Sequence, residues 1–163
     1  MLPSAFGGRN MTDLKIGVVD VFVLDAAQPM RVLLLRRGEG TRCTGAWEVV
    51  HGRIEGEERP EDAAVREVRE ETGLKVQRLY SVTCQPFYLH RLGTVQLSVV
   101  FAAYVDAAFP TRLSVEHDLA EWVAAAAAVE RLTWPRSRQV LRDIQGLLAD
   151  GNAGPVEDVL RVR

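Results

Sequence analysis

The sequence predicts a single α/β domain in which helices are layered on a sheet. Segments rich in β-branched and aromatic residues alternate with segments of helical spacing, and 163 residues suit one domain of ordinary size. The formal net charge of -2 is too small to attract nucleic acids or an anionic membrane strongly. We therefore expect no stable nucleic-acid binding and no membrane association, and any phosphate must be bound by a local site.

Strands are expected in six segments, because these are rich in β-branched and aromatic residues and are separated by turn-forming residues. They are residues 15–24, 31–35, 47–50, 76–88, 94–105 and 121–123. The order of these strands in the sheet does not follow from periodicity.

Three helices are expected between and after these strands. A glycine-containing loop at 52–59 leads into a helix that begins near Pro60 and ends at Gly73. The alanine-rich stretch 124–132 favours a second helix through intrinsic propensity. Pro135 starts a third, to about residue 148, whose apolar residues recur with helical spacing.

The ends of the chain and its cysteines suggest the domain organisation and the compartment. Residues 1–10 carry no sustained apolar stretch, which favours a flexible leader over a secretory signal. The domain is expected at 11–150, followed by a C-terminal tail at 151–163. Cys43 and Cys84 lack the spacing of a zinc or redox motif, so a reducing, cytoplasmic setting is the simpler interpretation.

Three glutamates on the first helix form a candidate metal site. Glu67, Glu70 and Glu71 stand at i, i+3 and i+4, so their carboxylates project from one side of the helix. Like charges at this spacing repel by roughly 0.2 to 0.5 kcal/mol per pair, and a divalent cation bound through oxygen would reverse that penalty. The alternative is a solvated acidic helix neutralised by Arg66 and Arg69.

The residues around these glutamates follow a pattern with many fixed positions. Its order is Gly52, five residues, Glu58, seven residues, Arg66-Glu67-Val68, one residue, Glu70-Glu71, one residue, and Gly73-Leu74. This segment resembles the Nudix box. The resemblance implies the Nudix fold, an α/β/α sandwich around a mixed sheet, with a loop-helix-loop motif that holds catalytic Mg²⁺, for which Mn²⁺ can substitute.

The resemblance also assigns roles. The three helix glutamates match the metal ligands, and the main-chain carbonyl of His51 often completes the set. Arg66 matches the arginine that steadies these glutamates, and Glu58 matches a glutamate that supports the loop or binds metal through water. The general base is the residue matching Glu67 in some relatives and a glutamate outside the box in others, for which Glu116 is the candidate.

Further candidates lie outside the box, and each has an ordinary structural alternative. Glu116 precedes His117 and lies six residues before Trp122, as in several Nudix enzymes, although it could be a simple loop acid. Arg36 and Arg37 end a strand, where one guanidinium could bind a phosphate or both could be solvated.

Aromatic residues are candidates for stacking on a substrate ring. Trp47, Phe87 and Tyr88 could each do so, although such residues are more often core. The box also departs from the family pattern, because Arg59 replaces the small hydroxyl residue frequent at the helix cap. This change should weaken the cap by around 1 kcal/mol without removing a metal ligand.

The segment at residues 132–138 indicates a narrower class of substrates. Leu132, Thr133, Trp134, Pro135 and Arg138 look similar to Nudix pyrophosphohydrolases of dATP and dihydroneopterin triphosphate. The resemblance implies hydrolysis of a nucleoside or pterin triphosphate to the monophosphate and pyrophosphate. ADP-ribose, NADH and dinucleoside polyphosphates remain alternative substrates. The alternative function is a noncatalytic nucleotide-sensing module. Because homodimers are common in the family, a dimer is plausible.

Overall fold

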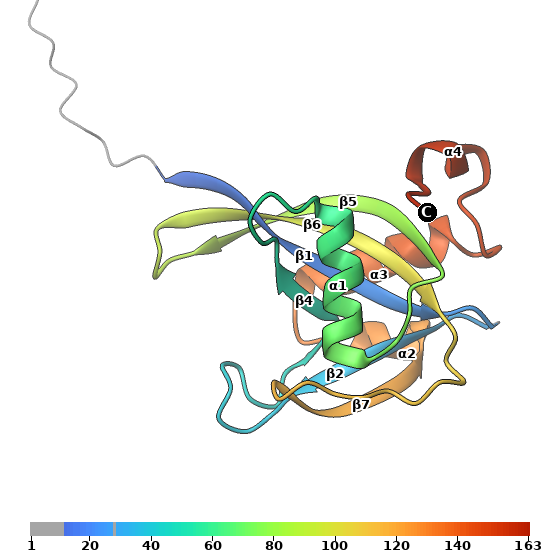
Figure 1. Ribbon diagram of the computed structural model, residues 1–163, viewed down its shortest axis with the longest axis horizontal. Coiled ribbons are helices and arrows are strands. Elements are labelled where there is room, and N and C mark those ends of the chain that lie inside the picture. The colour runs from blue at the N-terminus through green and yellow to red at the C-terminus, as the bar shows by residue number, and fades with distance from the viewer. Residues whose placement is uncertain (1–11, 28) are drawn as a thin grey trace, which may run out of the picture.

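One mixed sheet forms the centre of the computed structural model, which describes residues 12–27 and 29–163 (Figure 1). The expected leader at 1–10 lies outside the described residues. In the described part of the chain the sheet has seven strands in the order β3-β2-β1-β6-β5, with β4 beside β1 and β7 beside β2. The strands are β1 (Asp13–Asp25), β2 (Arg31–Arg37), β3 (Trp47–Glu48), β4 (Val50–Arg53), β5 (Arg78–Leu89), β6 (Thr94–Val105) and β7 (His117–Ala124).

Helices cover both faces of the sheet, so the α/β/α arrangement is confirmed. Helix α1 (Pro60–Thr72) packs on one face, and α2 (Ala125–Arg131) and α3 (Pro135–Leu147) pack on the other (Figure 1). The pairing of β1 with β6 is parallel, whereas β1 pairs with β2 and β4 in antiparallel fashion. None of the helices in the described segments is long and apolar enough to cross a membrane.

The alternation of side chains along the strands divides the core into two layers. On β1, Val19, Val21 and Val23 pack against α1, whereas Phe22 and Leu24 pack on the side of α2 and α3. The strands are apolar at consecutive positions because both faces are covered. This alternation also decides on which face each polar residue of the sheet lies.

Helix α1 begins and ends where the sequence predicts. Arg59 at the N-cap makes no side-chain capping hydrogen bond, and Pro60 follows it as the first helical residue. Gly73 adopts a left-handed conformation with φ of 72°, and its N–H donates to the carbonyl of Arg69. A Cβ at Gly73 would also lie 3.2 Å from the Cβ of Arg112.

Two strand predictions needed correction. The expected strand at 47–50 is two strands, because β3 pairs with β2 while β4 pairs with β1, so the chain changes partner at Val49. Gly52, expected in a loop, lies in β4 opposite Val19. The last strand is longer than 121–123, because β7 pairs with β2 along its length despite its mixed polarity.

The segment after residue 150 packs against β5. Its elements are a 3₁₀ turn (Gly154–Val156) and α4 (Glu157–Leu160). The Val162 N–H donates to the Leu79 carbonyl at 2.8 Å, and the Tyr80 hydroxyl donates to Glu157 at 3.0 Å. Sequence periodicity could not reveal this docking, because it depends on backbone pairing with a distant strand.

Replacing Leu34 by alanine should destabilise the fold strongly. Leu34 is fully buried in the layer that includes Phe22 and Leu141, so truncation leaves a cavity. We expect the free energy of unfolding to fall by about 2 to 5 kcal/mol, measured by urea denaturation. The matched Leu92→Ala variant, at a side chain that is 67% exposed, should change it by less than about 0.5 kcal/mol. Equal effects of the two substitutions would contradict the proposed core.

Candidate metal and substrate site

Arg66 gathers the carboxylates around α1. Its Nε and Nη2 donate to the two oxygens of Glu58, both at 3.0 Å, and its Nη1 donates to Glu67 at 2.8 Å and Glu70 at 3.1 Å. Nη2 also donates to the carbonyl of Arg53 at 2.7 Å. These hydrogen bonds hold the pKa of Glu58 below its usual value and raise that of Arg66. The structure thus brings together four of the residues named from the sequence.

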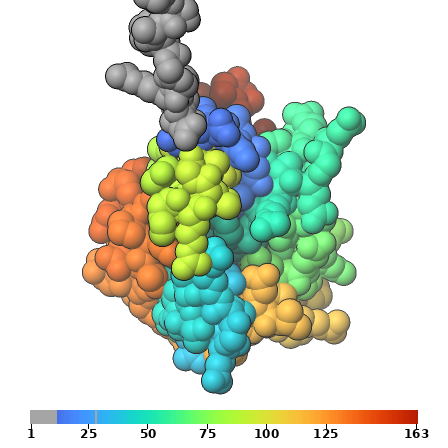
Figure 2. Space-filling view, turned by 90° about the vertical axis from the view of Figure 1, so that its left-hand side faces the viewer, coloured from blue at the N-terminus to red at the C-terminus, as the bar shows by residue number. Residues whose placement is uncertain are grey.

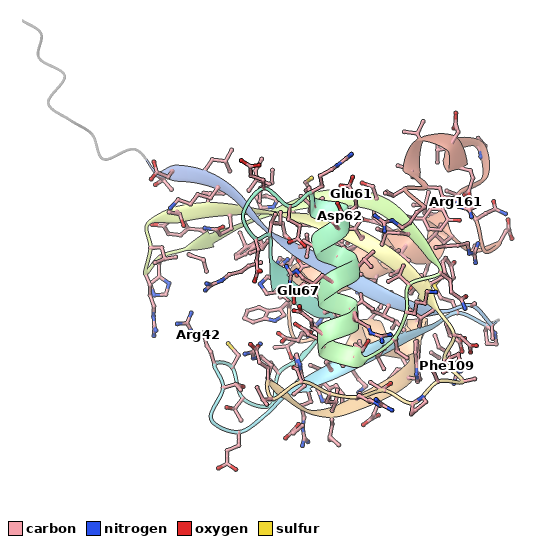
Figure 3. The ribbon with its side chains drawn as sticks, in the orientation of Figure 1. Arg42, Glu61, Asp62, Glu67, Phe109 and Arg161 are labelled. Atoms are coloured by element: carbon pink, nitrogen blue, oxygen red, sulfur yellow. The ribbon has the colours of Figure 1, made fainter. Side chains whose placement is uncertain are left out.

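Glu67 lies directly against the backbone of β4. A Cβ built on Gly52 would stand 1.9 Å from the Cδ of Glu67, so only glycine leaves room for this carboxylate. Because His51 precedes Gly52 in the same strand, the Glu67 carboxylate and this stretch of main chain are adjacent. Figure 3 shows Glu67 on the side of α1 that faces the loop carrying Arg42.

Glu71 is buried without a hydrogen-bond partner for one of its oxygens. Its Oε2 and the Nδ1 of His117 both lack partners and lie 4.0 Å apart. Burial, together with the charges of Glu67 and Glu48, raises the pKa of Glu71 to about 9. A bound cation would offset the cost of ionising a carboxyl group in such surroundings.

Glu48, in β3, lies beside the cluster of α1 carboxylates and connects it to the sheet. It accepts hydrogen bonds from Arg37 Nη1 at 3.0 Å, from the His117 imidazole at 3.2 Å and from the Trp134 indole at 3.4 Å. Burial raises its pKa, but the hydrogen bonds from His117 and Arg37 outweigh burial and hold the pKa below its usual value. The buried Glu48 is therefore a fixed negative charge beside Glu71.

The two strand-end arginines are already paired with protein groups. Arg37 donates to Glu48, to Glu116 at 3.1 Å and to the carbonyl of Arg42 at 2.6 Å. Arg36 forms a bidentate pair with Asp118 at 2.8 and 2.9 Å. Arg37 thus orients Glu116 close to the α1 carboxylates, and phosphate binding by either arginine stays a prediction.

A cavity of about 440 Å³ adjoins this group. The loop after β2, the β5–β6 hairpin and the start of α3 meet around it, and Figure 2 shows these three segments side by side. Its walls are Arg37, Arg42, Cys43, Glu48, His51, Phe87, Tyr88, Leu89, Trp134, Pro135 and Arg136. Tyr88, predicted from the sequence to stack on a ring, is therefore at the cavity.

Trp47 does not line this cavity. Its neighbour Glu48 points to the α1 face of the sheet, so alternation directs Trp47 to the opposite face, where it packs against the core. The guanidinium of Arg131 covers its ring at 4.2 Å. Substrate binding by Trp47 stays a prediction, and Trp134 is the tryptophan that lines the cavity.

A second polar cluster lies on the cavity wall, centred on the buried side chain of Asp20. This carboxylate accepts hydrogen bonds from His51 Nδ1 at 2.6 Å, from the Ser98 hydroxyl at 2.9 Å and from Arg136. Burial raises the pKa of Asp20, but His51 and Arg136 lower it to about 2. Despite burial, Asp20 in turn raises the pKa of His51.

The α1 carboxylates of Glu67, Glu70 and Glu71 form a group that offers suitable ligands for a magnesium ion. Its oxygen ligands are of the kind that hard divalent cations prefer, and the unpartnered Glu71 oxygen and the Glu67 carboxylate held against Gly52 fit a bound cation. Among the described residues, no three acidic, histidine or cysteine side chains converge on one point. A cation would therefore compete with Arg66 for the oxygens of Glu67 and Glu70.

Asp20, Glu48 and Arg136 were not recognised from the sequence. Asp20 interrupts an apolar strand and Glu48 lies between Trp47 and Val49, and acids in such positions must find partners when the strand is buried. These positions could have marked both residues. Arg136 carries no comparable signal, because its contacts depend on how α3 packs against the sheet.

Comparisons with known proteins agree with this architecture. A family model described as the NUDIX domain matches residues 15–144. The chain is 39% identical over 114 residues to an octanoyltransferase of Myxococcus xanthus, covering 69% of this chain and 31% of that protein. It therefore spans about a third of that relative's length.

Solved structures share the fold. An Ap4A hydrolase from C. elegans, in a binary complex, superposes with a TM-score of 0.69 at 18% identity, covering 82% of this chain and 97% of that chain. A MutT protein from Methanosarcina mazei Go1 has a TM-score of 0.69 at 25% identity, with coverages of 83% and 95%.

Proposed function

Because this chain belongs to the NUDIX domain family, we propose that it is a magnesium-dependent hydrolase of a diphosphate linkage in a nucleotide-like substrate. The observation that carries the proposal is the buried Glu71 carboxylate, which lies among other acids with one oxygen unpartnered. Such a group is costly to ionise in a buried position unless a cation binds it. An acidic helix neutralised only by its arginines would leave Glu71 unexplained.

The glutamates of α1 are proposed to bind the metal ion, and Arg66 positions them. Glu67, Glu70 and Glu71 would hold the ion, with the His51 carbonyl completing the set, and Arg66 keeps Glu67 and Glu70 close until it is bound. When bound, magnesium supplies neutralisation of phosphate charge and a lowered pKa for an attacking water. In the reaction, the water oxygen bonds to phosphorus, the bridging P–O bond breaks and a carboxylate accepts the proton.

Glu116 is our choice for the proton acceptor. It lies at the solvent side of the carboxylate group, with its side chain 55% exposed, and Arg37 holds one of its oxygens. Glu67 is less suited, because both Arg66 and the close Gly52 backbone restrict its carboxylate. The proposed base is therefore outside the glutamate helix.

The cavity supports a substrate with a flat ring attached to a phosphate chain. Phe87, Tyr88 and Trp134 provide aromatic walls, while Glu48 and Arg37 connect the cavity to the carboxylate group. We propose a nucleoside or pterin triphosphate, converted to the monophosphate and pyrophosphate. Dinucleoside polyphosphates and ADP-ribose are the competing substrates, and the similar fold of an Ap4A hydrolase keeps the former in consideration.

Chelation of divalent metal should abolish turnover. Purified protein is offered dGTP, dATP, dihydroneopterin triphosphate, ADP-ribose and Ap4A, and release of phosphate, pyrophosphate and nucleoside monophosphates is measured with magnesium and with EDTA. We expect pyrophosphate from at least one triphosphate with magnesium and none with EDTA, because the carboxylates alone cannot neutralise the phosphate chain.

Two other outcomes have clear meanings. Release of nucleoside monophosphates from ADP-ribose or Ap4A alone would keep the metal-dependent reaction but replace the substrate class. Binding of these compounds without turnover of any of them would reject the enzyme in favour of a nucleotide-sensing module.

A further inference from the structure

The side chains of Asp20, His51 and Arg136 form a cluster whose contacts are not explained by metal binding or by the hydrolytic step. It lies on the wall of the cavity, on the α3 face of the sheet, whereas Glu48 and Glu71 lie on the α1 face. We infer that Arg136 selects the ring of the substrate, favouring a ring edge with two neighbouring acceptors, as in oxopurines and pterins. This inference rests on the proposed function of the same site.

Arg136 is held in one orientation by two contacts. Its Nη1 bonds to the Asp20 carboxylate, and its guanidinium lies 4.5 Å from the centroid of the Phe87 ring. Asp20 is only 3% exposed and is itself fixed by His51 and Ser98. A buried, fully bonded carboxylate makes a rigid anchor, so the guanidinium has little freedom to follow different ligands.

The guanidinium retains donors for a ligand. In the described residues, Asp20 is the acceptor that it contacts, through Nη1, and the side chain is 22% exposed at the cavity. A guanidinium has five N–H donors and no acceptor, so it can bind only acceptor groups of a ligand. Asp20 already accepts hydrogen bonds from three protein groups. It is therefore not available to accept a hydrogen bond from a donor on the substrate ring.

These properties discriminate between rings. A guanine presents adjacent O6 and N7 acceptors, and arginine binds this pair in bidentate fashion. A dihydropterin presents an equivalent pair in its ring carbonyl and the neighbouring imine nitrogen. Adenine presents an amino donor beside N7, which would face the donors of Arg136 without a partner. The ring is therefore expected to be an oxopurine or pterin, with Tyr88 and Trp134 available for stacking.

The test is a comparison of kcat/KM for dGTP, dihydroneopterin triphosphate and dATP in the wild type and two variants. The wild type should prefer the first two over dATP by roughly 10-fold to 100-fold, the discrimination given by one bidentate pair. Arg136→Gln should remove most of that preference by lowering kcat/KM for dGTP and dihydroneopterin triphosphate far more than for dATP, because an amide can pair with the adenine edge but does not replace the paired donors of arginine. The control is Arg142→Gln, at an exposed arginine of the same helix, which should match the wild type.

A second measurement does not depend on turnover. Binding of dGMP and dAMP is measured by calorimetry in EDTA, where tighter binding of dGMP by the wild type and its loss in Arg136→Gln are expected. If Arg136→Gln kept the wild-type ratio of kcat/KM for dGTP and dATP, or if the wild type preferred dATP, the inference would be overturned. The proposed hydrolytic function would still stand. An equal loss for every triphosphate would also overturn it, since Arg136 would then bind the phosphate chain. Arg136-dependent dGMP binding without turnover would instead remove the proposed function alone.

Discussion

Replacing Glu71 by glutamine is expected to leave the protein folded and to remove most of its metal-dependent turnover. The amide has nearly the same shape but lacks the charge that would hold magnesium. The loss of kcat/KM should exceed the roughly 10-fold to 100-fold effect of residues that only orient a ligand. It is measured as pyrophosphate release at saturating magnesium.

The same variant carries an independent readout in its stability. Because burial beside Glu48 and Glu67 raises its pKa to about 9, Glu71 is protonated at neutral pH when no metal is present, so the amide replaces an uncharged carboxyl group of nearly the same shape. We expect the melting temperature in EDTA to be equal to or above that of the wild type. Magnesium should raise the melting temperature of the wild type and leave that of the variant nearly unchanged.

Two comparisons make this result decisive. Glu130→Gln, at an exposed glutamate of α2, should resemble the wild type in turnover and in its response to magnesium. Glu70→Gln should also lower turnover, because Glu70 is an expected ligand that Arg66 holds in the group. Wild-type turnover in both the Glu70 and the Glu71 variant would refute the proposed metal site.

Replacing Gly52 by alanine should separate activity from stability. The new methyl group would stand 1.9 Å from the Cδ of Glu67, so that carboxylate must leave its place beside β4. The glutamate side chain can rotate at small cost, and the backbone of Gly52 lies in a regular strand that alanine also adopts. We expect turnover to fall about 100-fold or more, with a change in the free energy of unfolding of about 1 kcal/mol or less.

Gly146 provides the matched control for this substitution. It lies within α3, and a Cβ there would meet nothing within 4 Å. Gly146→Ala should therefore stabilise the protein by about 0.5 to 1 kcal/mol and leave turnover unchanged. If Gly52→Ala retained full turnover, the close approach of Glu67 to β4 would have no part in catalysis.

Much of the fold could be predicted because local signals and tertiary packing agree. Pro60 and Gly73 delimit α1 in the sequence and in the structure, and the apolar strand segments are where β-branched residues gather. The change of partner at Val49 could not be predicted, because it depends on β1 accepting a second antiparallel neighbour. The position of β7 likewise depends on the free edge of β2.

The candidate site was only partly visible for a similar reason. The glutamates of α1 follow from helical spacing, which fixes their common side of the helix. Trp47 and Glu48 are neighbours in the sequence, but strand alternation sends them to opposite faces, and the sequence alone did not reveal which one faces the site. The anchoring of Arg136 by Asp20 joins residues far apart in the chain, beyond the reach of any local pattern.

The separation of the carboxylate helix and the Asp20 cluster onto opposite faces of one sheet has a consequence for how this protein could diversify. Substitutions at Phe87 or Arg136 alter contacts of the α3 layer, whereas those at Glu67 or Glu71 alter the α1 layer, and residues without shared partners usually have additive effects. Mutational drift, or a directed-evolution library confined to the α3 layer, could therefore change the accepted ring while the bond-breaking apparatus is inherited unchanged.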